Sequence, residues 1–432
     1  MRRWMATGAA VMLSVLAVLS AGCGGDSAGG SGDDGVVEIT FWHGQTEETA
    51  TELNTLIDEF NETHPRIRVS KDAGGVQADD MLTKVTAALA GGSYPDIAYI
   101  FGPDVANVAR SPKVLDLTET VRAPDWTWDD FYKPERDAVT VDGKVRAVPA
   151  LADVLAVIYN KRLFADAGVP EPDGTWTWDE FRATAKQLTD RGKGVFGTSW
   201  PGVGGEDTVW RLWPMVWQLG GEILSPDGTS VGFDDDSGLR SLTTIHDLAV
   251  TDESTYIDPD PSSDRTGQLF QNGKLAMWTA GPWALLDVRV SGVEAGVARL
   301  PSYDGEPLSI AGPDNYVLFD NGSARSRAAI EFVKWLTAAE QDLRYSEATG
   351  HLPLRKSATR LPGYPAFART WPGIPVFVES LETAKVRPTI EAYPELSDAV
   401  GKGIVSVLLD RASPADALKT MSEQANDVLA SE

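Results

Sequence analysis

The sequence predicts an α/β protein in which a largely parallel sheet is flanked by helices. This prediction rests on two kinds of segment that alternate along the chain. Segments of the first kind show the two-residue alternation of a strand or are continuously apolar, and segments of the second kind have apolar residues at helical spacing. This order is typical of sheets covered by helices. The 432 residues, of which 42% are hydrophobic, allow two or three domain-sized units with sizeable cores.

The first elements follow a βαβα order. Apolar and polar residues alternate over Val37–Trp42, which predicts a strand. The next segment places apolar residues on one helical face and is ended by Pro65. A second strand is expected at 66–70, a second helix at 79–90, and a strand buried on both faces at 96–102. The first helical face consists of Ala50, Leu53, Leu56, Ile57 and Phe60.

The strand and helix pattern starts again after an apolar segment at 145–160. A helix is expected over Trp178–Thr189, because Thr177 and Glu180 have the spacing of a capping box. Its first residues, WTWDEF, nearly repeat WTWDDF at 126–131, and we interpret both as helix starts. Further strands are expected at 273–278 and 296–303, a helical stretch at 328–350, and a terminal helix at 413–430 capped by Ser413.

The N-terminal residues have the layout of a secretory signal. Arg2 and Arg3 precede an apolar stretch that ends in small residues, and its 16 residues are fewer than the about 20 that span a bilayer. Cys23, the only cysteine in the sequence, follows directly. Residues 1–22 resemble a bacterial lipoprotein signal, although Ser20 stands where that pattern prefers Leu. The resemblance implies lipidation of Cys23; the alternative is an ordinary signal with an incidental cysteine.

The residues after the signal are expected to act as a tether. Residues 23–35 hold the cysteine and a run of Gly, Ser and Asp that cannot bury a core, so a flexible linker is expected. The formal charge of −25 becomes −27 without Arg2 and Arg3. Such acidity argues against nucleic acid and anionic lipid as partners, and leaves the lipid anchor as the only expected membrane contact. We expect a monomer.

Catalytic and metal-binding motifs are scarce in the sequence. It contains no phosphate loop, and its four histidines show no metal-ligand spacing. The acidic segment 258–264 fits a calcium loop poorly and is expected to be a solvated loop. A carboxylate pair such as glycoside hydrolases use stays open, because 63 residues are acidic. We therefore expect no enzyme, no metal and no cofactor.

Five blocks in order resemble the family 1 extracellular solute-binding proteins, the carbohydrate receptors of ABC importers. They are ITFWHG, PDIAYIFGPDVANVARSPKVLDLTE, VRAVPALADVLAVIYNKRLFADAGV with TWTWDEFRATAKQLT, FQNGKLAMWTAGPWAL, and AAIEFVKWLTAAEQ with GHLPLRKSA. The resemblance runs from about Val37 to the C-terminus. It implies a periplasmic-binding-protein-like fold of the class II type, with two α/β lobes, hinge strands between them and a ligand cleft.

The resemblance also implies that each lobe is discontinuous. The N-terminal lobe is expected from residues 36–151 plus about 303–350, and the C-terminal lobe from 152–302 plus about 351–432. The hinge crossings are expected near 150–155, 300–303 and 350–354.

Candidate ligand contacts fall at the carboxyl ends of strands, where ligands of open α/β sheets bind. Those after the first strand are His43, Gln45 and Glu47, and those after the third are Phe101, Gly102 and Asp104.

The family resemblance adds three ligand contacts from later parts of the chain. Asp153 matches an acidic position that holds sugar hydroxyls, and Trp210 and Trp283 match aromatic residues that stack on sugar. A carboxylate accepts from two hydroxyls at once, and flat aromatic rings suit the C–H-rich face of a pyranose. The alternatives are a hinge role for Asp153 and core packing for the tryptophans.

Three further residues complete the candidate set. Gly312 and Asn315 begin a strand near the expected cleft, where glycine lets a ligand approach the backbone. Arg355 either bonds ligand hydroxyls or pairs with one of the many acids. The expected function is a lipid-anchored receptor on the outer face of the cytoplasmic membrane, which passes a carbohydrate to the permease of an ABC importer.

Alternatives to a neutral sugar receptor stay open. The segment FWH is similar to glycerophosphodiester receptors of the same family, which need a cationic clamp that only Arg355 or Arg387 offers here. Ile100 stands where a maltose-binding family member has tryptophan, so maltose itself is not expected. A secreted glycan-active enzyme and a structural or signalling lipoprotein are the other classes considered.

Overall fold

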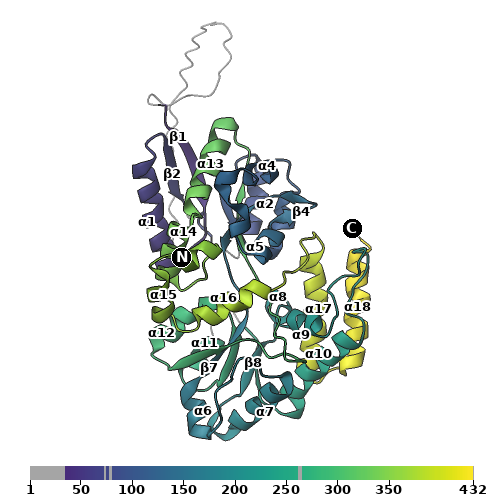
Figure 1. Cartoon of the computed structure of the whole chain (residues 1–432). Helices are drawn as coiled ribbons and strands as arrows, with labels where there is room; N and C mark the ends of the chain where they lie inside the picture. Colours follow the sequence, from purple (N-terminus) through teal and green to yellow (C-terminus); the bar gives the residue numbers. More distant parts are fainter. Residues whose placement is uncertain (1–34, 73, 77–79, 261–264, 432) are drawn as a thin grey trace, which may run out of the picture. The chain divides into compact units, whose positions relative to one another are not determined.

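Figure 1 shows the chain as a computed structural model that describes residues 35–72, 74–76, 80–260 and 265–431. The expected signal peptide and the lipidation site Cys23 lie outside the described residues, as does the linker except for Gly35. No helix of the described part is both long and apolar enough to cross a bilayer.

The largest sheet of the described residues has the strand order β2-β1-β3-β12-β6. β1 runs parallel to β2 and β3, whereas β12 is antiparallel to β3 and β6. The bounds are β1 (Val37–Trp42), β2 (Ile67–Asp72), β3 (Ile97–Ile100), β6 (Val148–Leu151) and β12 (Asp314–Leu318).

The remaining sheets are small. β10, β7 and β11 form an antiparallel sheet, β8 pairs with β9 in parallel, and β4 with β5 forms a hairpin. The bounds are β4 (Thr140–Val141), β5 (Lys144–Val145), β7 (Ala156–Asn160), β8 (Thr198–Pro201), β9 (Thr255–Asp258), β10 (Met277–Ala280) and β11 (Ala295–Ala298). The prediction of a largely parallel sheet is therefore wrong for β10, β11 and β12. The chain enters β12 after leaving β11, which is a strand of another sheet. β12 therefore does not belong to a local βαβ unit, and its direction relative to β3 and β6 cannot be derived from one.

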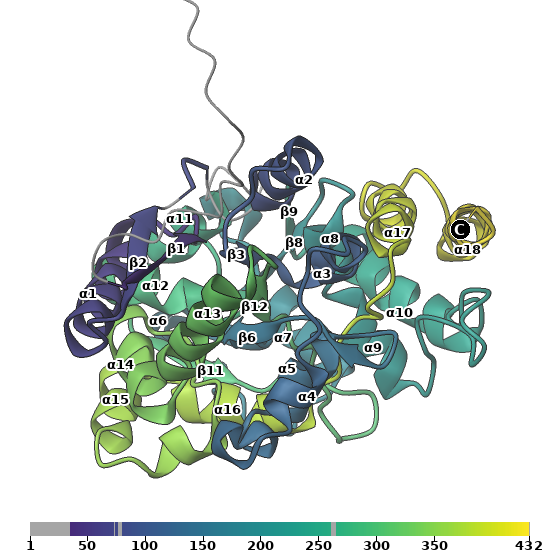
Figure 2. The same cartoon turned by 90° about the horizontal axis from the view of Figure 1, so that it is seen from above.

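The helices pack against these sheets, and α13 lies on β1 and β12 (Figure 2). The helices of the described residues are α1 (Glu47–Thr63), α2 (Met81–Gly91), α3 (Val105–Ala109), α4 (Thr118–Val121), α5 (Lys133–Ala138), α6 (Lys161–Ala167), α7 (Trp178–Leu188), α8 (Glu206–Val209), α9 (Leu212–Gln218), α10 (Asp236–His246), α11 (Arg265–Gln271), α12 (Leu285–Ser291), α13 (Ser323–Leu336), α14 (Ala339–Thr349), α15 (Tyr364–Thr370), α16 (Ile374–Thr383), α17 (Tyr393–Leu408) and α18 (Pro414–Leu429).

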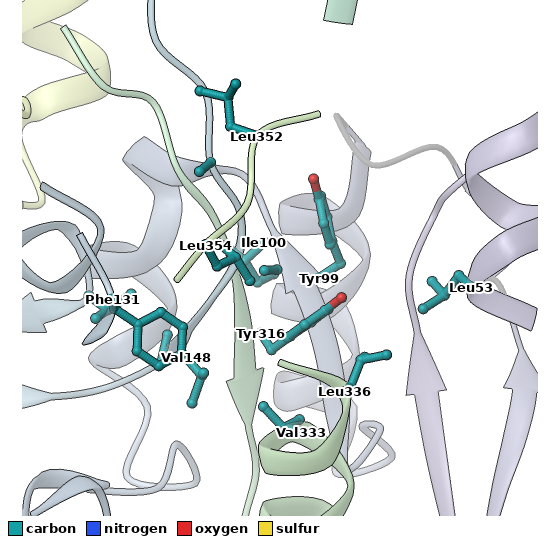
Figure 3. Close-up of a cluster of buried hydrophobic side chains, with 14 of the residues drawn as sticks. Leu53, Tyr99, Ile100, Phe131, Val148, Tyr316, Val333, Leu336, Leu352 and Leu354 are labelled. Atoms are coloured by element: carbon teal, nitrogen blue, oxygen red, sulfur yellow. The ribbon is translucent and has the colours of Figure 1, made fainter. Parts of the chain in front are cut away.

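Buried apolar side chains form two clusters. One surrounds the five-stranded sheet, and Figure 3 shows Tyr99 of β3, Tyr316 of β12 and Val333 of α13 gathered there. The other joins α7, α9, α10, α17 and α18 and contains Trp213, whose indole N–H donates to the Tyr393 hydroxyl (2.9 Å). Burial of this size is the main source of stability in such a fold. Trp213 is fully buried in this cluster.

The two near-identical tryptophan hexapeptides fold differently. WTWDEF begins α7, and the predicted capping box at Thr177 and Glu180 is confirmed. WTWDDF forms two short 3₁₀ turns separated by Thr127 at φ 45°, so the predicted helix start there is wrong. The helical stretch expected at 328–350 is likewise two helices, α13 and α14, separated by Thr337 and Ala338. Ser413 caps α18 as expected.

Replacing Thr177 by alanine is expected to cost about 1 kcal/mol of unfolding free energy, because its hydroxyl accepts from the Glu180 N–H (3.2 Å) at the start of α7. Urea unfolding followed by circular dichroism measures this loss. Thr243→Ala, on an exposed position inside α10, is the matched control and should have little effect. Equal midpoints for Thr177→Ala and the wild type would contradict the prediction.

Candidate functional site

Two of the candidate residues after β1 contact each other. The Gln45 backbone N–H donates to His43 Nδ1 (3.0 Å), and His43 Nε2 has no hydrogen-bond partner among the described residues. Burial lowers the pKa of His43, so the ring is held neutral. Glu47 is the first residue of α1, and its side chain lies outside the described residues.

The end of β3 carries a short 3₁₀ turn, Gly102–Asp104, that contacts the start of β12. The Gly102 N–H donates to Asp314 Oδ1 (3.1 Å), and the Tyr99 hydroxyl donates to Asp314 Oδ2 (2.5 Å). A Cβ on Gly102 would lie 2.3 Å from the Pro313 carbonyl oxygen, so only glycine fits there. Phe101, just before the turn, is 38% exposed.

The first passage between the two larger sheets, from β6 to β7, contains Asp153. Its neighbours form bridges with two other segments, Val154 with Ala311 and Ala152 with Leu352. The Gly312 N–H donates to the Asp153 carbonyl oxygen (2.9 Å). The Asp153 side chain is buried, and its Oδ1 lies 3.5 Å from His351 Nδ1 without a hydrogen bond.

The passage into β12 lies later than the crossing expected at 300–303. Ser302 pairs with Thr177, next to α7, whereas Ile310 and Ala311 run beside Lys385 and Val154. The lobe boundaries drawn from the sequence stay predictions.

Trp210 and Trp283 form a pair next to Gly312. Their ring centroids are 5.6 Å apart and the planes are tilted by 30°. Trp210 is 8% exposed and Trp283 is 37% exposed, so Trp283 has the more accessible ring. A Cβ on Gly312 would lie 2.6 Å from Trp210 Cζ2, and one on Gly281 would lie 1.9 Å from Trp283 Cζ3. The two glycines therefore let the rings pack directly against the backbone.

Arg387 links Trp210 to the turn at Gly102. The sequence suggested it only as a cation that would clamp a phosphate group. Its guanidinium lies 5.6 Å from the centroid of the Trp210 ring and pairs with Glu206 (2.6 Å). Its second terminal nitrogen would lie 3.1 Å from a Cβ on Gly102. Asp314 and Glu206 were not among the sequence candidates, because nothing in a local motif distinguishes them from the other acidic residues.

Several carboxyl groups near Asp153 are enclosed by protein. Burial, helped by the charge of Asp153 and opposed by the hydrogen bonds from Tyr99 and Gly102, raises the pKa of Asp314 to about 7. Burial raises the pKa of Glu135 well above its ordinary value, and neither of its oxygens has a partner among the described residues. Glu135 therefore favours the protonated, neutral form, and Asp314 keeps its proton to a much higher pH than an exposed aspartate does.

The structure brings together six of the sequence candidates through direct contacts or shared neighbours. Asn315 belongs to them, since its amide donates to the Pro313 carbonyl (3.2 Å). Asp104 lies in the turn after β3. The connected residues are Gly102, Asp153, Trp210, Trp283, Gly312 and Asn315.

Arg355 lies apart from this set. Its side chain donates to the Thr337 carbonyl (2.5 Å) and the Thr127 hydroxyl (2.9 Å), and its guanidinium lies 4.0 Å from the Phe131 ring centroid. These contacts use the guanidinium to join the C-terminal end of α13 to the turn before α5. Arg355 is thus a structural residue and leaves the ligand-contact set.

Four of the candidate residues have a buried polar atom without a hydrogen-bond partner. Among the described residues, the buried atoms without a hydrogen-bond partner include His43 Nε2, Asp153 Oδ1, Trp210 Nε1 and Asn315 Oδ1. Each such atom costs free energy unless a partner is supplied. A ligand rich in hydroxyl groups supplies both donors and acceptors.

Two hollows lie beside Arg387. A narrow one is lined by Gly102, Pro313 and Arg387, and a larger one of about 520 Å³ shares Val386 and Pro388 with it. The larger cavity is bounded by α5, the segment after α9 and residues 382–388, and Trp217 forms part of its wall. The described residues contain no group of three His, Cys, Asp or Glu side chains able to hold a metal ion.

Comparison with known proteins supports this picture. The model of a family described as bacterial extracellular solute-binding proteins matches residues 43–342. The sn-glycerol-3-phosphate-binding periplasmic protein UgpB of Pectobacterium atrosepticum is 23% identical over 92% of this chain and 93% of its own. A putative binding protein of Brucella abortus is 24% identical over 99% of both chains.

Solved structures show the same fold. The cyclic α-maltosyl-1,6-maltose binding protein of Arthrobacter globiformis has a TM-score of 0.82 and 29% identity, over 92% of this chain and 100% of that one. UgpB of Mycobacterium tuberculosis, solved with glycerophosphocholine, has a TM-score of 0.81 and 21% identity, over 93% and 99% of the two chains. The two-lobed α/β fold expected from the sequence is confirmed.

Proposed function

The chain belongs to the bacterial extracellular solute-binding protein family, and from this premise we propose that it is the substrate-binding lipoprotein of an ABC importer that captures a sugar or oligosaccharide. The observation that carries the proposal is the Trp210–Trp283 pair, which Gly312 connects to Asp153, together with the buried Trp210 Nε1 and Asp153 Oδ1, which have no partner among the described residues. Aromatic faces with a few polar groups at the rim are what a pyranose requires.

Each group has a defined task in this proposal. Trp283 offers its exposed ring to the apolar face of a sugar, and Trp210 supports it from the side of Gly312. Asp153 Oδ1 accepts hydroxyl hydrogens, and Asn315 Oδ1 provides a second acceptor.

Binding does no chemistry on the ligand. A ligand that contacts both lobes only when the cleft is closed shifts the population toward the closed form by its difference in affinity for the two forms. The permease then recognises that closed form. Anchoring through Cys23 is part of the same proposal and is supported by the signal-like residues before it.

We propose a neutral ligand rather than a glycerophosphodiester, which is the alternative that the UgpB relatives suggest. Arg355 is occupied by Thr337 and Thr127, and Arg387 is paired with Glu206. A phosphate group would also approach Asp153, whose carboxylate repels it.

Thermal unfolding of the purified chain with a panel of sugars and sn-glycerol 3-phosphate tests the proposal. A neutral sugar that binds the folded state at 100 times its Kd adds about 2.7 kcal/mol and raises the Tm. Absence of any shift across mono- and oligosaccharides would refute the sugar proposal. Release of reducing ends from the same panel would identify the glycan-active enzyme instead.

A further inference from the structure

Arg387 is a buried cation among the predicted ligand contacts. It is 8% exposed, lies against the Trp210 ring and flanks Gly102 at the end of β3. The phosphate-binding alternative requires such a guanidinium, because its planar fork matches phosphate oxygens. A free charge on Arg387 would therefore favour ligands that carry a phosphate group.

Glu206, the first residue of α8, compensates that charge. Its Oε1 lies 2.6 Å from the Arg387 guanidinium and also accepts from the Tyr393 hydroxyl (3.2 Å). Its Oε2 accepts from the Ser397 hydroxyl (2.6 Å). Both oxygens are thus held in place by α17, and the ion pair needs no ligand to form it.

The other groups near Arg387 add no positive charge. Asp314 is close enough to act on the Arg387 charge and accepts from the Gly102 N–H, and burial raises the pKa of Asp314 to about 7. Glu206 is therefore the carboxylate that makes the direct ion pair with Arg387.

We infer that Glu206 is a specificity-determining residue, which neutralises Arg387 and so makes the site accept uncharged sugars and reject ligands that carry a phosphate group. The inference rests on the proposed function and refines it, since it assigns the rejection of anions to one side chain. Binding that discriminates by charge needs such an opposing element as well as attractive contacts.

The test compares Glu206→Gln with the wild type, using sn-glycerol 3-phosphate and inorganic phosphate as probes in calorimetric titrations at low salt. The wild type should bind neither measurably. Glu206→Gln should gain about tenfold or more in affinity for both probes, because one opposing charge a few ångströms away has been removed. The double variant Glu206→Gln/Arg387→Gln should lose this gain.

Glu222→Gln is the matched control, since it removes the exposed partner of Lys385 (2.6 Å) close to the same segment without freeing a buried arginine. It should leave phosphate binding absent. A folded Glu206→Gln variant that gains no phosphate binding overturns the inference.

Leaving a buried arginine unpaired is destabilising, so circular dichroism must first show that Glu206→Gln is folded. Should it fail to fold, Arg387→Gln decides. Wild-type binding of sn-glycerol 3-phosphate that Arg387→Gln abolishes would show that Arg387 is a free clamp, and this also overturns the inference. The thermal screen with sugars does not depend on these phosphate titrations. Failure of the proposed function can therefore be distinguished from failure of the inference about Glu206.

Discussion

Asp314→Asn is expected to be more stable than the wild type above pH 7 and similar to it near pH 4. Burial raises the pKa of this carboxyl from 3.8 to about 7 in the folded protein. The folded state therefore holds a proton that the unfolded state releases between these two values, so wild-type stability falls as the pH rises through that window. At about 1.4 kcal/mol per pKa unit, the full loss is about 4 kcal/mol.

Asparagine mimics the neutral acid at this position. Its oxygen can accept from the Gly102 N–H, and its amide can donate to the Tyr99 hydroxyl oxygen, so the local geometry is kept. The variant has no carboxyl to ionise at this position. Its stability should therefore not show this part of the loss as the pH rises.

Urea unfolding at pH 5, 6, 7 and 8 measures the effect. Asp166→Asn, an exposed carboxylate on α6, is the control and should follow the wild type at each pH. Parallel curves for Asp314→Asn and the wild type would contradict the burial argument.

Trp283→Ala is expected to weaken sugar binding by about 2 kcal/mol, or roughly thirtyfold, while the free energy of unfolding changes little. The ring is 37% exposed and leans on Trp210 and Gly281, so its removal empties a ligand-facing surface more than it opens a core. Calorimetric titration with the sugar found in the thermal screen measures the loss.

A second partly exposed tryptophan provides the comparison. Trp128 packs on Phe131 in the turn before α5 (5.0 Å between ring centroids) and lines a different hollow from the two beside Arg387. Trp128→Ala should leave the sugar affinity unchanged. Equal affinity for Trp283→Ala and the wild type would remove Trp283 from the binding surface.

The sequence predicted secondary structure correctly where the residues that determine an element lie within one short segment. The alternation in Val37–Trp42 predicts β1 with the observed bounds, and Thr177 with Glu180 predicts the start of α7. The same reasoning failed for WTWDDF, because Thr127 takes a left-handed conformation and the chain turns before a helix forms. Tertiary packing outweighs weak local preferences in such short segments.

The candidate site was only partly accessible to sequence reasoning. Trp210 and Trp283 were found through the family resemblance, and the structure places their rings together. Arg355 was a candidate by residue type alone, and its contacts with Thr337 and Thr127 show a structural role.

By itself, the sequence determined the α/β class, the main secondary-structure elements and the family, because periodicity, caps and ordered blocks are properties of neighbouring residues. Only the tertiary structure decided which acids and cations meet. Glu206 and Arg387 are 181 positions apart, and Tyr99 and Asp314 are 215 apart, yet each pair is in hydrogen-bond contact. Charge compensation and burial depend on distances in space, and no local pattern encodes those distances.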